Sequence, residues 1–193
     1  MQHKSLRGMA CPIARTLDRV GEWWTMLILR DAFAGFTRFE QFQTSLDIAP
    51  NMLTRRLQTL VKSGLLERRL YSDRPPRHEY VLTQKGHDFW PVLVTLAAYG
   101  NEHFAEHGVA TRLVDRATGK PVEVVVADKG TGRILDRKHF KYSPGPRADA
   151  ALKLRISYAD ARQEGRDGRP EWEAFAKARK EKSRRNRLAS GRD

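Results

Sequence analysis

Residues 49–69 read APNMLTRRLQTLVKSGLLERR, and this stretch determines how the rest of the chain is interpreted. Pro50 suits the first position of a helix, where a missing N–H group costs nothing. The apolar residues that follow recur at three- and four-residue spacing, the period of an amphipathic helix, at Leu53, Leu57, Leu60 and Val61. We expect a helix over residues 50–63 with this apolar stripe buried.

The opposite side of that helix is polar and basic, and two interpretations fit it. Arg can bind guanine through two hydrogen bonds, and Asn or Gln can bind adenine in the same way, so the face could lie in the major groove of DNA. A solvated surface helix would also carry such a face. Arg56 lies nearer the apolar stripe and can equally be an internal ion-pair partner. The candidate DNA-binding residues on this helix are Asn51, Met52, Thr54, Arg55, Gln58, Thr59 and Lys62.

Three shorter helices are expected before this one. The apolar periodicity over residues 12–34 predicts two helices, interrupted at Gly21. A third begins near Thr37, whose hydroxyl suits an N-cap with Glu40 three residues on. The helix at 50–63 is therefore the fourth in the chain.

A β-hairpin follows the fourth helix. Strand-like runs at 66–71 and 78–82 flank a polar, basic loop, and a helix over residues 84–106 comes next, kinked or restarted at Pro91. Helices followed by a hairpin predict an α+β winged helix-turn-helix fold, with the hairpin 66–82 as the wing. Donors that could reach phosphates or a minor groove concentrate around the wing at Arg69, Tyr71, Ser72, Arg74 and Arg77.

The chain beyond the winged helix-turn-helix differs in composition. Within residues 109–146, the runs PVEVVVAD and GRILD flank KGTG, which predicts a small β-hairpin segment. Residues 147–193 form a basic tail, disordered or partly helical with one short helix near 171–182. This tail would either hold DNA non-specifically through counterion release or dock through that helix. We therefore divide the chain into 1–108, for DNA binding and dimerisation, 109–146, and 147–193.

Composition limits the class of protein. The chain has 193 residues, and 36 Lys and Arg against 23 Asp and Glu give a net charge of +13, which favours a polyanionic partner, either nucleic acid or an anionic membrane surface. No stretch approaches 18 uninterrupted apolar residues, and the N-terminus lacks an apolar signal region, so we expect a cytoplasmic protein with no membrane partner. One cysteine excludes an internal disulfide and suits a reducing compartment.

Four stretches of the sequence carry a resemblance to a known family. They are CPIARTLDRVGEWWTMLILRD, GFTRFEQF, IAPNMLTRRLQTLVKSGLLERR and RPPRHEYVLTQKG, which occur in family order and spacing over roughly residues 10–105. On these motifs the chain resembles the HxlR family of bacterial transcriptional regulators, relatives of the MarR-type winged-helix proteins.

The resemblance implies a partner and an assembly. It implies a homodimer that reads operator DNA with the helix at 50–63 and the wing at 66–82. The dimer would form through the N-terminal helix and the helix at 84–106. Two features depart from the family: Trp23 stands where a lysine is common, and the β-rich segment lacks the paired cysteines of longer members, so no zinc site is expected there.

Cys11 directly precedes Pro12 and is expected at the N-cap or first turn of the first helix. Backbone N–H groups, the helix dipole and Arg15 one turn on can lower the pKa of its thiol. The resemblance implies a redox-sensing role, because quinone- and hypochlorite-sensing family members use a cysteine at this place. The alternative is a small buried residue packed at the dimer interface.

The stretch HFAEH matches the H-x-x-E-H pattern of a zinc peptidase at His103 and His107. Such an enzyme needs a third ligand and a cleft, and surface residues at a helix end are the alternative. Residues 26–29 could line an effector pocket or belong to the core. No catalytic constellation stands out, and neither a cofactor nor a metal is expected.

The sequence as a whole predicts a sequence-specific transcriptional regulator that is not an enzyme. We expect a dimeric repressor that reads an inverted-repeat operator in double-stranded DNA and responds to an unidentified small-molecule or redox effector. A less specific nucleic-acid-binding protein, architectural or RNA-binding, is the first alternative. A zinc hydrolase that uses His103 and His107 is the remote one.

Overall fold

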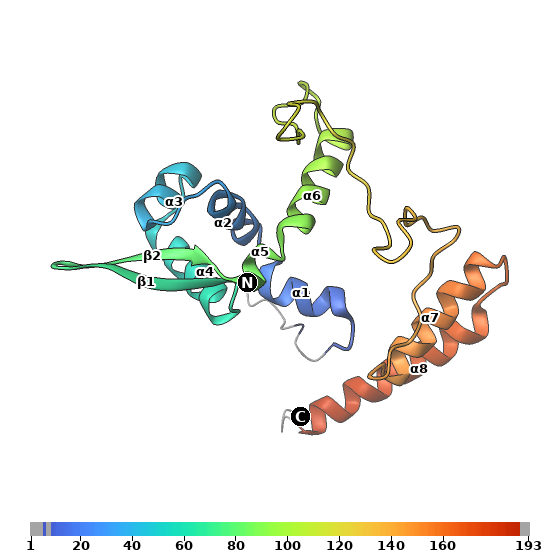
Figure 1. The fold of residues 1–193 in the computed structure, drawn as a ribbon. Coiled ribbons are helices and arrows are strands. Elements are labelled where there is room, and N and C mark those ends of the chain that lie inside the picture. Colours follow the sequence, from blue (N-terminus) through green and yellow to red (C-terminus); the bar gives the residue numbers. More distant parts are fainter. Residues whose placement is uncertain (1–5, 7–8, 190–193) are drawn as a thin grey trace. The chain divides into compact units, whose positions relative to one another are not determined.

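The computed structural model describes residue 6 and residues 9–189, and these divide into two compact units (Figure 1). One unit is made of residues 16–134. The other joins the N-terminal segment up to residue 15 with the chain from residue 135 onward. No helix in the described ranges is both long enough and apolar enough to cross a membrane.

The first unit is built around the expected winged helix-turn-helix. Its helices and strands follow in the predicted order, and the two strands pair antiparallel. The elements are α1 (Pro12–Val20), whose first turn belongs to the other unit, α2 (Trp23–Phe33), α3 (Phe39–Leu46), α4 (Pro50–Lys62), β1 (Leu66–Asp73) and β2 (Pro76–Leu82). The α+β fold class is confirmed.

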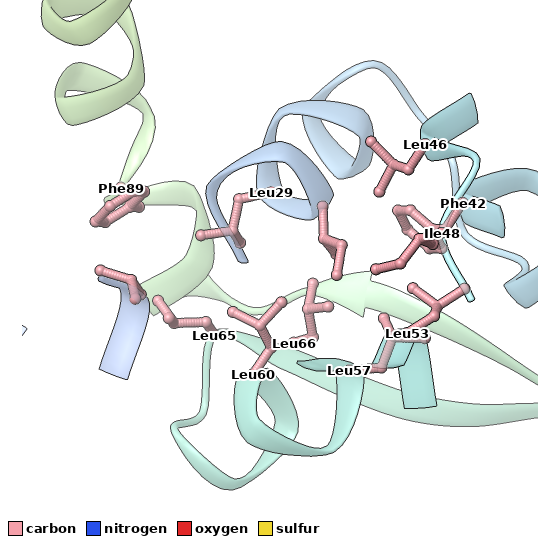
Figure 2. Close-up of a cluster of buried hydrophobic side chains, with 12 residues drawn as sticks. Leu29, Phe42, Leu46, Ile48, Leu53, Leu57, Leu60, Leu65, Leu66 and Phe89 are labelled. Carbon is pink, nitrogen blue, oxygen red and sulfur yellow. The ribbon is translucent and has the colours of Figure 1, made fainter. Parts of the chain in front are cut away.

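The apolar stripe of α4 forms the centre of the core (Figure 2). Leu53, Leu57 and Leu60 are fully buried and lie in one cluster with residues from α2, α3 and β1, including Ile28 and Phe42. Burying each such side chain contributes about 1.5–3 kcal/mol, so the rotation of α4 about its axis is fixed. The side opposite the leucines therefore has to face solvent.

The start of α3 differs from the expectation. Thr37 does not cap the helix; Arg38 occupies the N-cap position. The side-chain oxygen of Gln41, rather than that of Glu40, accepts hydrogen bonds of 2.9 Å from the backbone N–H groups of both Thr37 and Arg38. A Gln three residues after the cap closes a capping box as well as a Glu does, so the helix begins one residue later than predicted.

The helix expected over residues 84–106 is two helices. Thr83 caps the short α5 (Gln84–His87), accepting a 3.1 Å hydrogen bond from the N–H of Gly86, and α6 (Trp90–His103) restarts with Pro91 in its first turn. A side chain at position 86 would lie 2.2 Å from the carbonyl oxygen of Leu65, so this packing requires glycine. Of the two possibilities expected at Pro91, a kink or a restart, the structure shows a restart.

Residues 113–135 do not form the predicted hairpin of two strands. Instead the structure has two turns of the same design, which begin at Asp115 and at Asp128 and are each closed by a single β-bridge. In each turn the first aspartate accepts hydrogen bonds from the following residues, and a glycine with positive φ, Gly119 or Gly132, completes it. Both turns have the sequence Asp-x-x-Thr-Gly followed by Lys or Arg, and they begin thirteen residues apart. The hydrogen bonds of each turn are made within the turn itself, so the turn does not require the flanking valines to pair as strands.

The basic tail is more ordered than expected. Residues 150–189 contain two helices, α7 (Ala150–Gln163) and α8 (Arg169–Ala189), where one short helix was predicted. They pack side by side as an antiparallel hairpin in which Ala161 is fully buried (Figure 1). The rings of Tyr158 and Trp172 lie 5.9 Å apart at one end.

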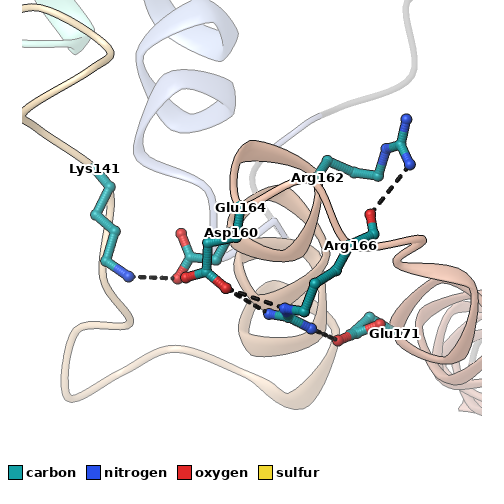
Figure 3. Close-up of polar contacts among 6 residues, drawn as sticks. All are labelled: Lys141, Asp160, Arg162, Glu164, Arg166 and Glu171. Carbon is teal, nitrogen blue, oxygen red and sulfur yellow. Dashed lines mark hydrogen bonds and ion pairs between the residues drawn. The ribbon is translucent and has the colours of Figure 1, made fainter.

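Ion pairs hold this hairpin together. At the connection between the helices, Arg166 pairs with Glu164 and Glu171, both at 3.0 Å (Figure 3). At the other end Asp149 caps α7, accepting a 2.8 Å hydrogen bond from the N–H of Leu152, and pairs with Lys182 of α8 at 2.6 Å. Lys182 and this N–H together lower the pKa of Asp149. Part of the charge in the tail is therefore paired within the hairpin.

Candidate nucleic-acid interface

The exposed face of α4 carries four side chains whose polar groups are open to a binding partner. Asn51, Arg55, Gln58 and Lys62 are all exposed and have no hydrogen-bond or ion-pair partner among the described residues. They offer two amides and two cations from a helix whose other side is locked in the core. The helix N-terminus at Pro50 adds a partial positive charge at the same surface.

The other three candidates on α4 are less free. Met52 is half-buried and packs against the core. The hydroxyls of Thr54 and Thr59 donate to the carbonyl oxygens of Pro50 and Arg55, at 2.8 and 2.9 Å. Each hydroxyl oxygen can still accept a hydrogen bond, so the two threonines retain a smaller binding capacity.

Arg56 has a structural partner. Its guanidinium donates to a carboxylate oxygen of Glu22, just before α2, at 2.9 Å. Both side chains are partly buried, and the pair ties α4 to the start of α2. Of the two roles that the sequence allowed, Arg56 has that of an ion-pair partner.

The tip of the wing is the second basic surface. Arg74 and Arg77 are exposed and lack partners in the described part of the chain. The hydroxyl of Ser72 donates to the carbonyl oxygen of Pro75 at 3.1 Å, so it shapes the tip. Arg69 forms an ion pair with Glu67 on the same strand, which reduces the charge it can offer to a phosphate.

Tyr71 contacts Arg38, a residue that the sequence did not single out. The guanidinium of Arg38 lies over the Tyr71 ring, 4.8 Å from its centre, and the backbone of Arg38 bridges to Glu79 on β2. Arg38 thereby becomes an exposed cation at the wing. No local pattern identifies it, because its partners lie more than 30 residues away in the sequence.

Cys11 lies directly before α1, as expected, and its thiol has a lowered pKa. The largest cause is the backbone N–H of Ala14, followed by that of Ile13 and by the guanidinium of Arg155 from α7. The neighbour that acts on it is therefore Arg155 rather than the expected Arg15. A hollow of about 130 Å³ beside Cys11 is also lined by Arg179 and Lys182.

His103 and His107 lie at the end of α6 and just beyond it. The His103 ring contacts the Tyr99 ring, with 4.4 Å between ring centres and a tilt of 55°, and a carboxylate oxygen of Glu102 lies 3.8 Å from His103 Nε2. Among the described residues, no group of three or more His, Cys, Asp or Glu side chains could hold a metal ion. Residues 26–29 belong to the core: Ile28 and Leu29 are fully buried, and Met26 and Leu27 pack against them.

The sequence of this chain is similar to those of known proteins. The sequence profile of the HxlR-like helix-turn-helix family matches residues 19–108. An uncharacterized HTH-type transcriptional regulator of Mycobacterium tuberculosis (strain ATCC 25618 / H37Rv) is 36% identical over 141 residues, which are 72% of this chain and 89% of the relative.

Two solved structures are similar in sequence and fold. The proposed transcription factor PA1374 of Pseudomonas aeruginosa is 50% identical, with a TM-score of 0.56, and all of it is matched by 76% of this chain. A second proposed transcription factor, PA1607, is 38% identical with a TM-score of 0.66, matched in full by 74% of this chain. The chain belongs to the HxlR-like helix-turn-helix family and is a DNA-binding transcriptional regulator.

Proposed function

We propose that the protein is a dimeric repressor that reads an inverted-repeat operator, with α4 in the major groove and the wing at the adjacent backbone or minor groove. The observation that carries this proposal is the face of Asn51, Arg55, Gln58 and Lys62, which is exposed, has no partner within the described part of the chain, and lies on a helix fixed by three buried leucines. Amides and guanidinium groups are the side chains that discriminate between base pairs. Blocking polymerase at such a site, in the cytoplasm and without an enzymatic step, is the simplest mode of action.

Exposed apolar side chains on α6 support the dimer. The 14-residue helix has no buried residue, and Val92, Leu96 and Tyr99 follow each other on one side of it, each about half exposed. Ile13 and Leu17 of α1 are similarly exposed. Two helices with apolar surfaces of this kind are what a second copy would cover, and a two-fold axis then gives two inverted half-sites.

Selection of duplexes from a random pool tests this proposal. The wild-type protein is expected to enrich a motif of two inverted half-sites. Arg55→Ala removes a side chain that can bind one base through two hydrogen bonds, so it should lose about 1–3 kcal/mol of discrimination at one position in each half-site. Arg116→Ala, which removes an exposed arginine from the turn at 115–120, is the control and should enrich the wild-type motif. No enriched motif with wild-type protein would contradict the proposal.

A redox role for Cys11 is a second proposal, carried by the surroundings of the thiol. The N–H groups at the start of α1 and the guanidinium of Arg155 favour the thiolate, which is the reactive form. Three cations, Arg155, Arg179 and Lys182, and one carboxylate, that of Asp149, line the neighbouring hollow, and the excess of positive charge would attract an anionic oxidant.

The pH dependence of alkylation tests this second proposal. The rate with iodoacetamide should reach half its maximum below the ordinary pKa of a thiol, and Arg155→Gln should move that midpoint upward. A midpoint at the ordinary value in both proteins would leave Cys11 a packing residue. In wild-type protein, oxidation should also change the dissociation constant for the selected duplex, whereas Cys11→Ser should abolish that response.

A further inference from the structure

The described cations of α8 and of the loop before it fall into two groups. Those on the inner side have acidic partners: Arg166 with Glu164 and Glu171, Lys182 with Asp149, and Arg179 close enough to Asp149 to help lower its pKa. Those on the outer side are exposed and have no partner among the described residues. We call the second group the outer cations: Lys177, Lys180, Arg184 and Arg185.

The outer cations lie on one side of α8. Lys177, Lys180 and Arg184 are spaced three and then four residues apart, which places them in a row along a helix, and Arg185 widens the row. Seven residues of helix span about 10 Å, and one strand of DNA presents a phosphate about every 3.4 Å along its axis. Glu181 is the acidic residue within this row, so the surface keeps a net positive charge.

The packed side of α8 faces elsewhere. Lys182 and Arg179 lie near Asp149, and the ring of Trp172, which is about half exposed, contacts Tyr158 and Phe175, at 5.9 and 5.6 Å between centres. The aromatic residues of α8 are therefore separate from the outer cations. In the described part of α8, the large apolar residues Trp172 and Phe175 precede the outer cations in the sequence, whereas a helix that lies in a membrane surface carries basic and large apolar residues together along its length.

We propose that the outer cations of α8 bind the phosphate backbone of double-stranded DNA without reading its sequence, as a second DNA contact in addition to that of the winged helix. The inference rests on the proposed function for the nature of the partner. Four cations without acidic partners are matched in charge to phosphates, and Lys and Arg that neutralise phosphates release counterions from DNA. The row offers no amide side chain, so it raises affinity for all sequences alike.

The salt dependence of binding measures this contact. The full-length protein is titrated with a fluorescent random-sequence duplex between about 50 and 200 mM salt. The test variant carries Lys177→Gln, Lys180→Gln, Arg184→Gln and Arg185→Gln, substitutions that keep good helix formers. Each lost phosphate contact removes about 0.9 from the slope of log affinity against log salt, so the slope should fall by about 3 to 4.

A matched variant separates the contact from net charge. It carries Arg112→Gln, Arg116→Gln, Lys120→Gln and Lys129→Gln, which remove the same charge from exposed positions around the two Asp turns. Its slope should fall by less than about 1, the equivalent of one contact. Circular dichroism of both variants should show wild-type helix content.

Three results would overturn the proposal. The slope could stay unchanged in the α8 variant, or it could fall equally in both variants, which would assign the effect to net charge alone. Binding to vesicles of mixed phosphatidylglycerol and phosphatidylcholine could fall in the α8 variant while DNA binding does not, which would assign the surface to a membrane. The proposed function is tested by a different experiment, the selection of duplexes, and a selected motif that does not depend on Arg55 would contradict it without affecting the α8 proposal.

Discussion

Two helices of this protein, α4 and α8, present to solvent cations that have no acidic partner among the residues the structure describes, and the helices differ in the side chains that accompany those cations. On α4, Arg55 and Lys62 alternate with the amides of Asn51 and Gln58. On α8, the outer cations stand without amides. Amides and guanidinium groups discriminate bases, whereas isolated cations neutralise phosphates, so we expect sequence selectivity from α4 and general affinity for DNA from α8.

The two helices also differ in how they are held. Three fully buried leucines fix α4, while α8 packs on α7 through Ala161, an aromatic cluster and ion pairs that remain partly exposed. Reading a base requires a side chain that is held in one place. A contact with phosphates tolerates more movement, because each phosphate is equivalent to the next.

The largest expected effect comes from the support of α4. Leu57→Ala leaves a cavity under α4, since Leu57 is fully buried, and should lower the free energy of unfolding by about 2–5 kcal/mol. Urea denaturation followed by tryptophan fluorescence and by circular dichroism measures the change. An effect below about 0.5 kcal/mol, typical of a surface site, would contradict the core assigned to α4.

The next largest effect is expected at the proposed dimer interface, because a monomer cannot bind both half-sites of an operator at once. Leu96→Glu places a charge on the apolar side of α6, so sedimentation should show monomers. Affinity for the selected duplex should fall on the order of 100-fold, because the two half-sites are no longer bound together. Ala97→Glu, at an exposed position away from that side, should remain dimeric. A dimeric Leu96→Glu protein would contradict the interface.

The smallest effect concerns the hairpin. Asp149→Ala removes the N-cap of α7 and the partner of Lys182, and should cost this hairpin about 0.5–2 kcal/mol. Because folding lowers the pKa of Asp149, its contribution is present above the ordinary carboxyl value and is lost as the pH falls through the lowered value. Hydrogen exchange of the α7 amides, compared at neutral and acidic pH, measures both effects. Equal protection in the two proteins at neutral pH would contradict the role of the cap.

The elements that the sequence predicted well are those specified by neighbouring residues. The leucine spacing and Pro50 predicted α4 within a residue of its observed end, and Pro91 marked the restart of α6. Local periodicity and the steric demands of proline act over a few residues, so they can be evaluated without the fold. The exposed face of α4 follows from the same spacing.

The features that the sequence did not predict have two physical causes: contacts between residues far apart in the sequence, and turns whose hydrogen bonds are made within the turn itself. Arg38 over Tyr71, Arg56 with Glu22 and Arg155 near Cys11 join residues that are 33 to 144 positions apart in the sequence. The run PVEVVVAD has the composition of a strand, but the turn at Asp128 is completed by its own hydrogen bonds. A strand needs a partner, and composition alone does not supply one.

The central claim is that α4 reads sequence and α8 does not. It is tested most directly by the ratio of dissociation constants for the selected duplex and a scrambled duplex of equal length. This ratio is measured in the wild type, in Arg55→Ala and in the variant that lacks the outer cations. We expect Arg55→Ala to reduce the preference about tenfold or more, and the α8 variant to weaken both duplexes equally and keep the preference. An unchanged preference in Arg55→Ala, or an equal loss of preference in both variants, would contradict the account.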